Sequence, residues 1–406
     1  MEMQHKLSET PKLNVAAGRT TCSIFKIPQT LIDINGKSYE PHIVSVGPFH
    51  HGQPHLEMVE EHKWRLLRQL LNRTQTKGMV LEDFLRAVQP LEATARESYS
   101  VTIPYNTDEF IEMMVLDGCF IIELFRMLGG LVEVDEYDPL VSMTWIVPFF
   151  FRDLIRSENQ IPFFVLECLF ELTKTPKSPT LATLALGFFN RTLQRPDNVL
   201  EKCSNVKAKH LLDLLRSSFI PLELEHCTEP GNLPPPHIIH NISKLKRSGI
   251  KLKPWEAESF LMVKFKNGVI HMPTITIDDF MCTGCSKIFT TYVTLLDSLV
   301  NTSKDVGLLC DQNIIENYLG TDAEVATFFN NMGKDISFDI DECYLARLFD
   351  DVNRHYHSGW HTQWAGLKYT YFSTPWSFVS VMAASVLLVF TVVQTIYTIL
   401  GYTRPR

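Results

Sequence analysis

The chain has 406 residues, of which 45% are hydrophobic and 11% aromatic, and its formal net charge is -8. This length allows two or three ordinary domains or one large one, and the apolar content excludes a disordered chain. The acidic balance and the lack of a long charge block argue against a dedicated nucleic-acid binder, so we expect no nucleic-acid partner.

The first part of the chain has the pattern of a polar tail followed by a turn-rich segment. Residues 1–20 are expected to form a disordered N-terminal tail, and they contain no apolar core of signal-peptide length. The stretch "GKSYEPHIVSVGPFHHGQPH" is rich in glycine and proline, which is typical of turns. Its motif residues are Gly47, Pro48, His50, His51 and Gly52.

Three helices are predicted next, because apolar residues recur at helical spacing over residues 55–73, 80–99 and 108–128. Asp108 is the expected N-cap of the third helix, and Gly129 with Gly130 is its expected end. A linker is expected from residue 197 to residue 209, and a further helix begins after it.

The pattern changes after residue 228. Residues 229–254 combine several prolines with the basic run "SKLKRSGIKLK" and are expected to form a Pro/Gly-rich, basic loop. Asn267 and Gly268 stand between two strand-like runs, which predicts a β-hairpin. Helices are then expected over "TTYVTLLDSLVNTSKDVGLL", "NIIENYL", "DAEVATFFNNM" and the stretch from "IDECYLARLF" onward.

The predicted fold class is therefore mainly α, or α+β: a multi-helix globular body with a small β-hairpin insertion and one C-terminal transmembrane helix. Residues 21–228 form the helical first part of a domain, and residues 255–367 carry the hairpin and the helical remainder of the same domain. The membrane helix is expected over residues 376–402.

Glu158, Asn159 and Gln160 stand in a row within an otherwise apolar region, directly before Ile161 and Pro162. Because proline lacks an N–H and clashes one turn back, one helix should end before Pro162 and another should begin there. The carbonyls of the first helix and the N–H groups of the second then lack partners. We expect the three polar side chains to bond those groups, with the carboxylate favoured by the dipole of the second helix.

No set of residues predicts a catalytic, metal or cofactor site. The histidines near His50 lie in a Gly/Pro loop, without the helix that would aim two ligands at one ion. Cys282 and Cys285 form a C-x-x-C, which is either half of a zinc site, a redox pair or two incidental thiols. The cluster "YHSGWHTQW" is either catalytic or packed at an interface, and the second interpretation is favoured.

The stretch from Phe378 to Leu400 is mostly apolar, and a helix of that length rises roughly 34 Å, enough to cross a bilayer core of about 30 Å. Trp376 stands just before it, where amphipathic rings prefer the interface. We therefore expect a single-pass, tail-anchored protein with the bilayer as a partner, a cytosolic body and the plasma membrane as the favoured location. The nine cysteines show no disulfide framework, which fits the cytosol.

Several segments together resemble one family, the plant proteins of the domain of unknown function 247. They are "YEPHIVSVGPFHHGQPHLEMVEEHKWRLL", "DEFIEMMVLDGCFIIEL", "ENQIPFFVLECLF", "HLLDLLR", "SKDVGLLCDQNIIENYLGTDAEVATFFNNM" and "YFSTPWSFVSVMAASVLLVFTVVQTIY". The resemblance implies a plant membrane protein with one C-terminal membrane helix and no established biochemical activity. It also makes Asp305 and Val306 motif residues.

Two features depart from the pattern of that family. Ser157 stands where the family usually has leucine. A stretch resembling Asn-Leu-Ile-Ala-Phe-Glu, which follows the hairpin in the family, is missing between Asp279 and Thr291.

The leading functional hypothesis is a membrane-anchored, non-enzymatic interaction or recognition module that binds an unidentified protein partner. An enzyme with an unrecognised site is the alternative, and it requires His50, His51 and Glu158 to converge in one pocket. A third hypothesis is a lipid-surface sensor that uses the basic run from Lys244 to Lys253. N-glycosylation sequons stand at Asn72, Asn190, Asn241 and Asn301, and they could be glycosylated only if the body faced the lumen.

Overall fold

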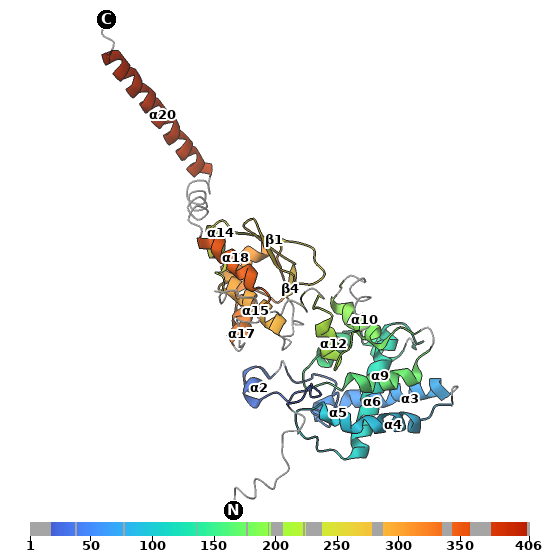
Figure 1. Cartoon of the computed structure of the whole chain (residues 1–406). Helices are drawn as coiled ribbons and strands as arrows, with labels where there is room; N and C mark the ends of the chain where they lie inside the picture. The colour runs from blue at the N-terminus through green and yellow to red at the C-terminus, as the bar shows by residue number, and fades with distance from the viewer. Residues whose placement is uncertain are drawn as a thin grey trace, which may run out of the picture. The chain divides into compact units, whose positions relative to one another are not determined.

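The computed structural model describes residues 18–36, 39–75, 78–135, 137–175, 178–193, 195, 206–221, 224, 238–277, 287–334, 343–357 and 375–403. Within them the chain is mainly helical with a small sheet and one long apolar C-terminal helix, as the sequence predicts (Figure 1). Contacts divide the chain into two units, Met1–Phe219 and Ile220–Arg406. Residues 1–17, most of the 197–209 linker, most of the proline loop, the C-x-x-C and most of "YHSGWHTQW" lie outside the described residues.

The described residues of the first unit form helices and loops, with one isolated β-bridge between Ile24 and Tyr99. Its elements are α2 (Gln29–Asn35), η2 (Pro54–Leu56), α3 (Glu57–Thr74), α4 (Leu81–Val88), η4 (Gln89–Leu91), α5 (Glu92–Glu97), α6 (Thr107–Leu128), α7 (Pro139–Ser142), η5 (Thr144–Ile146), α8 (Val147–Leu154), α9 (Phe163–Thr173), α10 (Leu181–Leu193) and α12 (Leu211–Ser217). The single helix expected over residues 80–99 is interrupted at η4, where Pro90 cannot continue an α-helix.

Helix α6 is the centre of this unit. Every residue from Met113 to Met127 is buried, which is typical of a helix surrounded by other elements. Helices α3, α4, α9 and α10 pack around it (Figure 1). Its N-cap is Asn106 and not Asp108 as predicted, because the Asn106 side chain accepts from the Glu109 N–H at 2.9 Å and the Glu109 carboxylate accepts from the Asn106 N–H at 3.1 Å.

The second unit combines helices with a three-stranded sheet and a two-stranded sheet. Its elements are α14 (Ile242–Arg247), β1 (Lys251–Pro254), β2 (Lys264–Lys266), β3 (Val269–Met272), β4 (Ile275–Ile277), α15 (Lys287–Leu299), α16 (Ser303–Cys310), β5 (Ile315–Asn317), α17 (Asp322–Lys334), α18 (Ala346–His357) and α20 (Pro375–Thr403).

The hairpin prediction is confirmed, and its turn has the expected chemistry. Strands β2 and β3 pair antiparallel, and Asn267 and Gly268 both have positive φ angles, 53° and 74°. Two consecutive positive φ angles define the tight hairpin turn that Asn-Gly favours. A third strand, β1, pairs parallel to β3 on its other side, which gives the order β1-β3-β2.

Three local predictions for this unit are wrong. The predicted helix over "NIIENYL" is strand β5, which pairs parallel to β4. The predicted helix over residues 290–309 is two helices, because Thr302 and Asp305 form a capping box that begins α16. The basic half of the predicted 229–254 loop is ordered as α14 and β1, since Leu245 and Leu252 are buried and hold both elements against the unit.

Helix α20 contains the apolar span Val379–Leu400, which has a mean hydropathy of 2.2 and is not buried against the rest of the chain. Five hydroxyl groups on this helix donate to the carbonyl four residues earlier, at 2.7–2.9 Å. They belong to Ser380, Ser385, Thr391, Thr395 and Thr398. The hydroxyls of these residues are therefore satisfied within the helix itself.

The contact between α6 and α9 generates a stability prediction. A Cβ on Gly118 would lie 2.4 Å from Leu169 Cδ1, whereas a Cβ on Gly187 in α10 meets nothing within 4 Å. We expect Gly118→Ala to destabilise the protein by about 1 kcal/mol net, because overpacking costs about 1–3 kcal/mol and helix propensity returns about 1. Gly187→Ala should be neutral or stabilising. The urea midpoint of the purified chain measures both, and equal shifts would contradict the packing argument.

Candidate functional site

The segment His42–Val46 is buried or half-buried backbone that is not part of any helix or strand, apart from the exposed His42 side chain. Side chains satisfy its polar groups. The Asp153 carboxylate at the end of α8 accepts from the N–H groups of His42, Ile43 and Val44 at 2.7–3.0 Å. In a sheet, a neighbouring strand would accept hydrogen bonds from these N–H groups. Here one carboxylate accepts all three and fixes the position of the segment.

Asn159 completes that arrangement with both ends of its amide. Its Oδ1 accepts from the Val46 N–H at 2.7 Å, and its Nδ2 donates to the Val44 carbonyl at 2.9 Å. Nδ2 also donates to the Asp153 carbonyl at 3.0 Å, so the same side chain closes the end of α8. Asn159 is 1% exposed, and every polar atom of its side chain has a partner.

Gln160 joins α8 to α12. Its Nε2 donates to the carbonyls of Leu154 and Arg156 at 2.7 and 2.9 Å, and its Oε1 accepts from the Leu212 N–H in the first turn of α12 at 3.1 Å. The predicted binding of α8 carbonyls therefore agrees with the structure. The predicted capping of the helix after Pro162 is wrong, because the Phe163 N–H donates to the Lys209 carbonyl instead.

Glu158 points to a different part of the unit than predicted. Its Oε1 accepts from the Ile27 N–H at 2.5 Å, and its Oε2 lies 3.3 Å from His50 Nε2. Burial raises the pKa of this carboxyl, but the bonds from His50 and the Ile27 N–H outweigh it and hold the pKa below its usual value. The carboxylate therefore fastens the N-terminal segment and is not placed at the dipole of α9.

The segment His42–Val46, which side-chain hydrogen bonds hold and which we call the pinned segment, is followed by Gly47, where the chain meets the Gln160 backbone. Its φ is +73°, and a Cβ there would be 2.6 Å from the Gln160 carbonyl oxygen and 3.2 Å from the Tyr99 hydroxyl. The Tyr99 hydroxyl donates to the same carbonyl at 3.1 Å. Only glycine fits both the backbone angle and this approach.

Lys63 on α3 is a fully buried cation with three acceptors. Its Nζ donates to Asp117 Oδ1 and the Ser45 carbonyl at 2.6 Å, and to Glu60 Oε1 at 2.5 Å. Asp117 Oδ2 also accepts from the Gly47 N–H at 2.8 Å. Burial lowers the pKa of Lys63, but Asp117 and Glu60 more than compensate, so the pKa lies above its usual value and the group stays charged.

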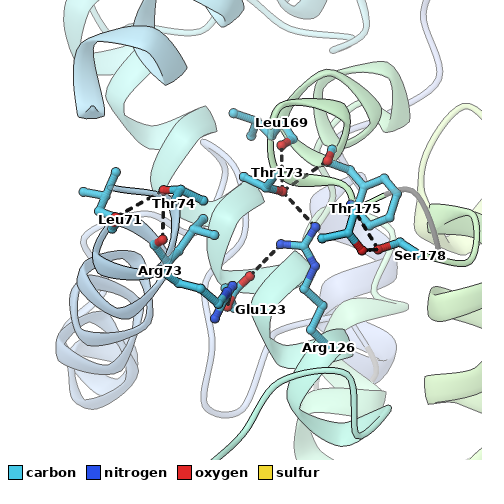
Figure 2. Close-up of polar contacts among 11 residues, drawn as sticks. Leu71, Arg73, Thr74, Glu123, Arg126, Leu169, Thr173, Thr175 and Ser178 are labelled. Carbon is cyan, nitrogen blue, oxygen red and sulfur yellow. Dashed lines mark hydrogen bonds and ion pairs between the residues drawn. The ribbon is translucent and has the colours of Figure 1, made fainter. Parts of the chain in front are cut away.

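A second network, buried except at Arg73, joins α3, α6 and α9 (Figure 2). Glu123 accepts from Arg73 at 2.5 Å and from Arg126 at 2.9 Å. Arg126 also donates to the Thr173 hydroxyl at 2.8 Å, and that hydroxyl bonds the Leu169 and Phe170 carbonyls at the end of α9. These groups are absent from the sequence-based predictions, although Asp117 and Glu123 inside the apolar run of α6 are a signal for buried polar contacts.

The remaining motif residues of the first unit do not gather at one point. His50 is buried, and its Nδ1 lies 3.3 Å from Gln53 Nε2. His51 is exposed and packs edge-on against Tyr105, with 5.6 Å between ring centroids. Pro48 is buried, and Gly52 has a φ of +76° with open space around it. An active site of His50, His51 and Glu158 requires all three side chains to converge. Only His50 and Glu158 lie close together.

Asp305 holds elements of the second unit together, as Asp153 holds the pinned segment in the first. Its carboxylate accepts from the Ser243 hydroxyl at 2.5 Å and from the Thr302 N–H and hydroxyl at 3.0 and 2.9 Å, which fastens α14 to α16. Burial raises the pKa of Asp305, but these bonds outweigh it and lower the pKa. Val306 beside it is fully buried. Among the described residues, no three His, Cys, Asp or Glu side chains converge as a metal site.

The motif residues therefore bond to the backbone around Asp153 and Asn159 in the first unit and around Asp305 in the second. The model of a plant family described as proteins of unknown function, DUF247, matches residues 24–390. The chain belongs to this family. It is 34% identical to the UPF0481 protein At3g47200 of Arabidopsis thaliana, covering 96% of this chain and 89% of that protein. It is 24% identical to the putative UPF0481 protein At3g02645 of the same plant, over 92% of this chain and 89% of the relative. No solved structure matches.

Replacing Lys63 tests whether the buried cation holds the pinned segment. We expect Lys63→Met to lower the free energy of unfolding by about 3–5 kcal/mol, because Asp117 is left buried without its countercharge. The double variant Lys63→Met/Asp117→Asn should recover part of the loss. Lys174→Met, which removes a surface partner of Glu171, should cost less than about 1 kcal/mol. Chemical unfolding measures all three, and equal losses for Lys63 and Lys174 would refute the assignment.

The lowered pKa of Glu158 predicts a pH dependence. Its stabilising contribution is fully present above the usual carboxyl pKa of 4.5 and is lost as the pH falls through the lower folded value. Glu158→Gln should therefore be less stable than the parent at pH 7, and the difference should shrink as the pH falls below 4.5. Unfolding midpoints between neutral and acidic pH give the comparison. A difference that is constant with pH would show that the Glu158 charge makes no contribution.

Proposed function

We propose that this protein is a membrane-anchored interaction module without enzymatic activity, with α20 in the bilayer and the body in the cytosol. The observation that carries the proposal is α20, whose apolar span Val379–Leu400 has no burial against the chain and whose hydroxyls are bonded internally. An exposed apolar helix of this length is unfavourable in water and matches the thickness of a bilayer core.

The polar residues of the motif support a non-enzymatic role. Asp153, Asn159 and Gln160 use their side-chain atoms on backbone groups, and Glu158 binds a backbone N–H with one oxygen. A general base or nucleophile needs a free atom aimed at a substrate. The His50–Glu158 pair is the one contact in favour of an enzyme, and both side chains are buried.

Exposed aromatic residues on the first unit support a protein partner. Trp64 on α3 is 52% exposed and Tyr137 is 85% exposed. Each is the sequence neighbour of one member of the Arg65–Asp138 ion pair, which joins α3 to the start of α7. Exposed aromatic residues and arginine are both enriched where proteins bind one another.

The described cysteines support a cytosolic body. Cys22, Cys119, Cys168, Cys310 and Cys343 are all free thiols. Burial raises the pKa of each of these thiols above its usual value, which keeps it protonated and unreactive. Free thiols are the default state in the cytosol and are less common in oxidising compartments.

Charges placed in α20 test the anchor. We expect the expressed chain to resist carbonate extraction from membranes, and Leu388→Arg/Val389→Arg to release it, because each charge at the bilayer centre costs about 2.5–3.5 kcal/mol. Thr398→Arg lies near the helix end, where a long side chain reaches the head groups, and should leave the protein in the membrane. A parent chain that carbonate extracts would overturn the proposal.

The side of the membrane and the lack of catalysis need separate measurements. Added protease should degrade the body on sealed cytosol-out vesicles, and the exposed Asn72 and Asn301 should carry no glycan. Glycosylation at either site would place the body in the lumen.

Turnover of any substrate by the purified chain, if lost in Glu158→Gln, would replace the interaction role with an enzymatic one.

A further inference from the structure

The sheet of the second unit gathers four lysines from two separate stretches of sequence. The register pairs Lys251 and Lys266 with Val269, and pairs Lys253 and Lys264 with His271. Residues paired across neighbouring strands point to the same side of a sheet. Lys251, Lys253, Lys264 and Lys266 therefore share one side, which we call the lysine face, and Val269 and His271 lie between them.

The opposite side of the sheet is apolar. Leu252 of β1 and Ile270 of β3 alternate with the lysine-face residues and are buried, at 4% and 0% exposure. Phe265 of β2 follows the same alternation and packs edge-on against His355 of α18, with 5.7 Å between ring centroids. All four lysines are exposed, so the lysine face is the outer side of the sheet.

The spacing makes these charges act together. With strands about 4.8 Å apart and alternate residues about 7 Å apart, the four Cα atoms outline a rectangle of about 10 by 7 Å. That is comparable with the Debye length of about 8 Å at physiological salt, so the positive potentials add. A cluster of like charges is unfavourable by itself and becomes favourable when an anion lies on it.

The described part of the chain offers these four lysines no carboxylate partner within ion-pair distance. Lys264 Nζ lies 4.5 Å from the centroid of the Trp255 ring. Glu256 and Glu258 follow β1 in the next loop and are exposed. The side-chain pattern of lysines beside a tryptophan is typical of protein surfaces at a membrane interface.

The chain also keeps this sheet near a bilayer. Helix α18 packs on the hairpin through His355 and ends at His357, and α20 begins at Pro375. The intervening chain spans at most about 60 Å even if fully extended. An anchored α20 therefore holds the lysine face at a high effective concentration relative to the lipid surface.

We propose that the lysine face binds the anionic lipid head groups of the membrane in which α20 is anchored. This inference rests on the proposed anchor and adds the chemistry of its lipid partner: phosphate-bearing, negatively charged head groups. The lysine face differs from a basic stretch of sequence, because Lys264 and Lys266 join it only through the sheet register. Lys246 and Arg247 belong to the basic stretch but lie on α14, outside the lysine face.

Chemical labelling of the full chain in nanodiscs tests the proposal. The chain is reconstituted in neutral phosphatidylcholine discs and in discs that also contain phosphatidylserine or a phosphoinositide, and amine-reactive and histidine-reactive reagents are applied. We expect the four lysines and His271 to be protected in anionic discs only, with the protection lost at high salt. The exposed Lys304 on α16 is the internal reference and should label equally in both discs.

Variants on and off the sheet separate the lysine face from general positive charge. Lys251→Gln/Lys253→Gln/Lys264→Gln/Lys266→Gln should lose the protection of His271, and Lys246→Gln/Arg247→Gln should keep it. The single variants Lys253→Gln and Lys264→Gln, which flank His271, should each weaken the protected state about fivefold. They replace the quadruple variant if that chain does not fold.

Three other outcomes would each overturn a different claim. A parent chain that enters the discs but labels equally in neutral and anionic discs overturns this inference and leaves the anchor intact. A chain that does not enter any disc overturns the proposed function itself. Protection in neutral discs after addition of inorganic phosphate would overturn the assignment to lipid, because the lysine face would then be a site for a free anion.

Discussion

The structure of the first unit depends on satisfying the backbone of His42–Val46, which is largely buried without belonging to a helix or a sheet. An unpaired buried N–H or carbonyl costs more than most single contacts contribute. Asp153 and Asn159 supply the missing partners, and the Lys63–Asp117 pair supplies those of Ser45 and Gly47. The motif residues are therefore tied to one another by hydrogen bonding, although they come from distant parts of the chain.

The same principle explains why polar residues occur in the most apolar parts of this protein. Glu123 and Arg126 neutralise each other inside the core around α6, and Asp305 collects donors from α14 and α16. Each buried charge is paired or bonded several times, as burial requires. These networks hold helices in register, and the polar atoms that form them are already bonded within the protein.

Local prediction succeeded where a residue acts on its neighbours. Asn267 and Gly268 predicted a hairpin because only such residues adopt two positive φ angles, and Gly129 with Gly130 ended α6 as expected. It was wrong where distant partners decided the outcome. "NIIENYL" is a strand because β4 offers it a parallel partner, and Glu158 binds Ile27, which is 131 residues away. Short apolar segments and long-range polar bonds carry no periodic signal.

The sequence by itself determined the helical class, the apolar C-terminal helix, the hairpin turn and the family, because these follow from periodicity, length, turn chemistry and shared motifs. Only the tertiary structure decided what the motif residues do. It assigned Asn159 and Gln160 to the pinned segment and to α12, and it brought Lys251 and Lys264 onto one face. The physical reason is that hydrogen-bond partners and strand register are set by the packing of elements far apart in the chain.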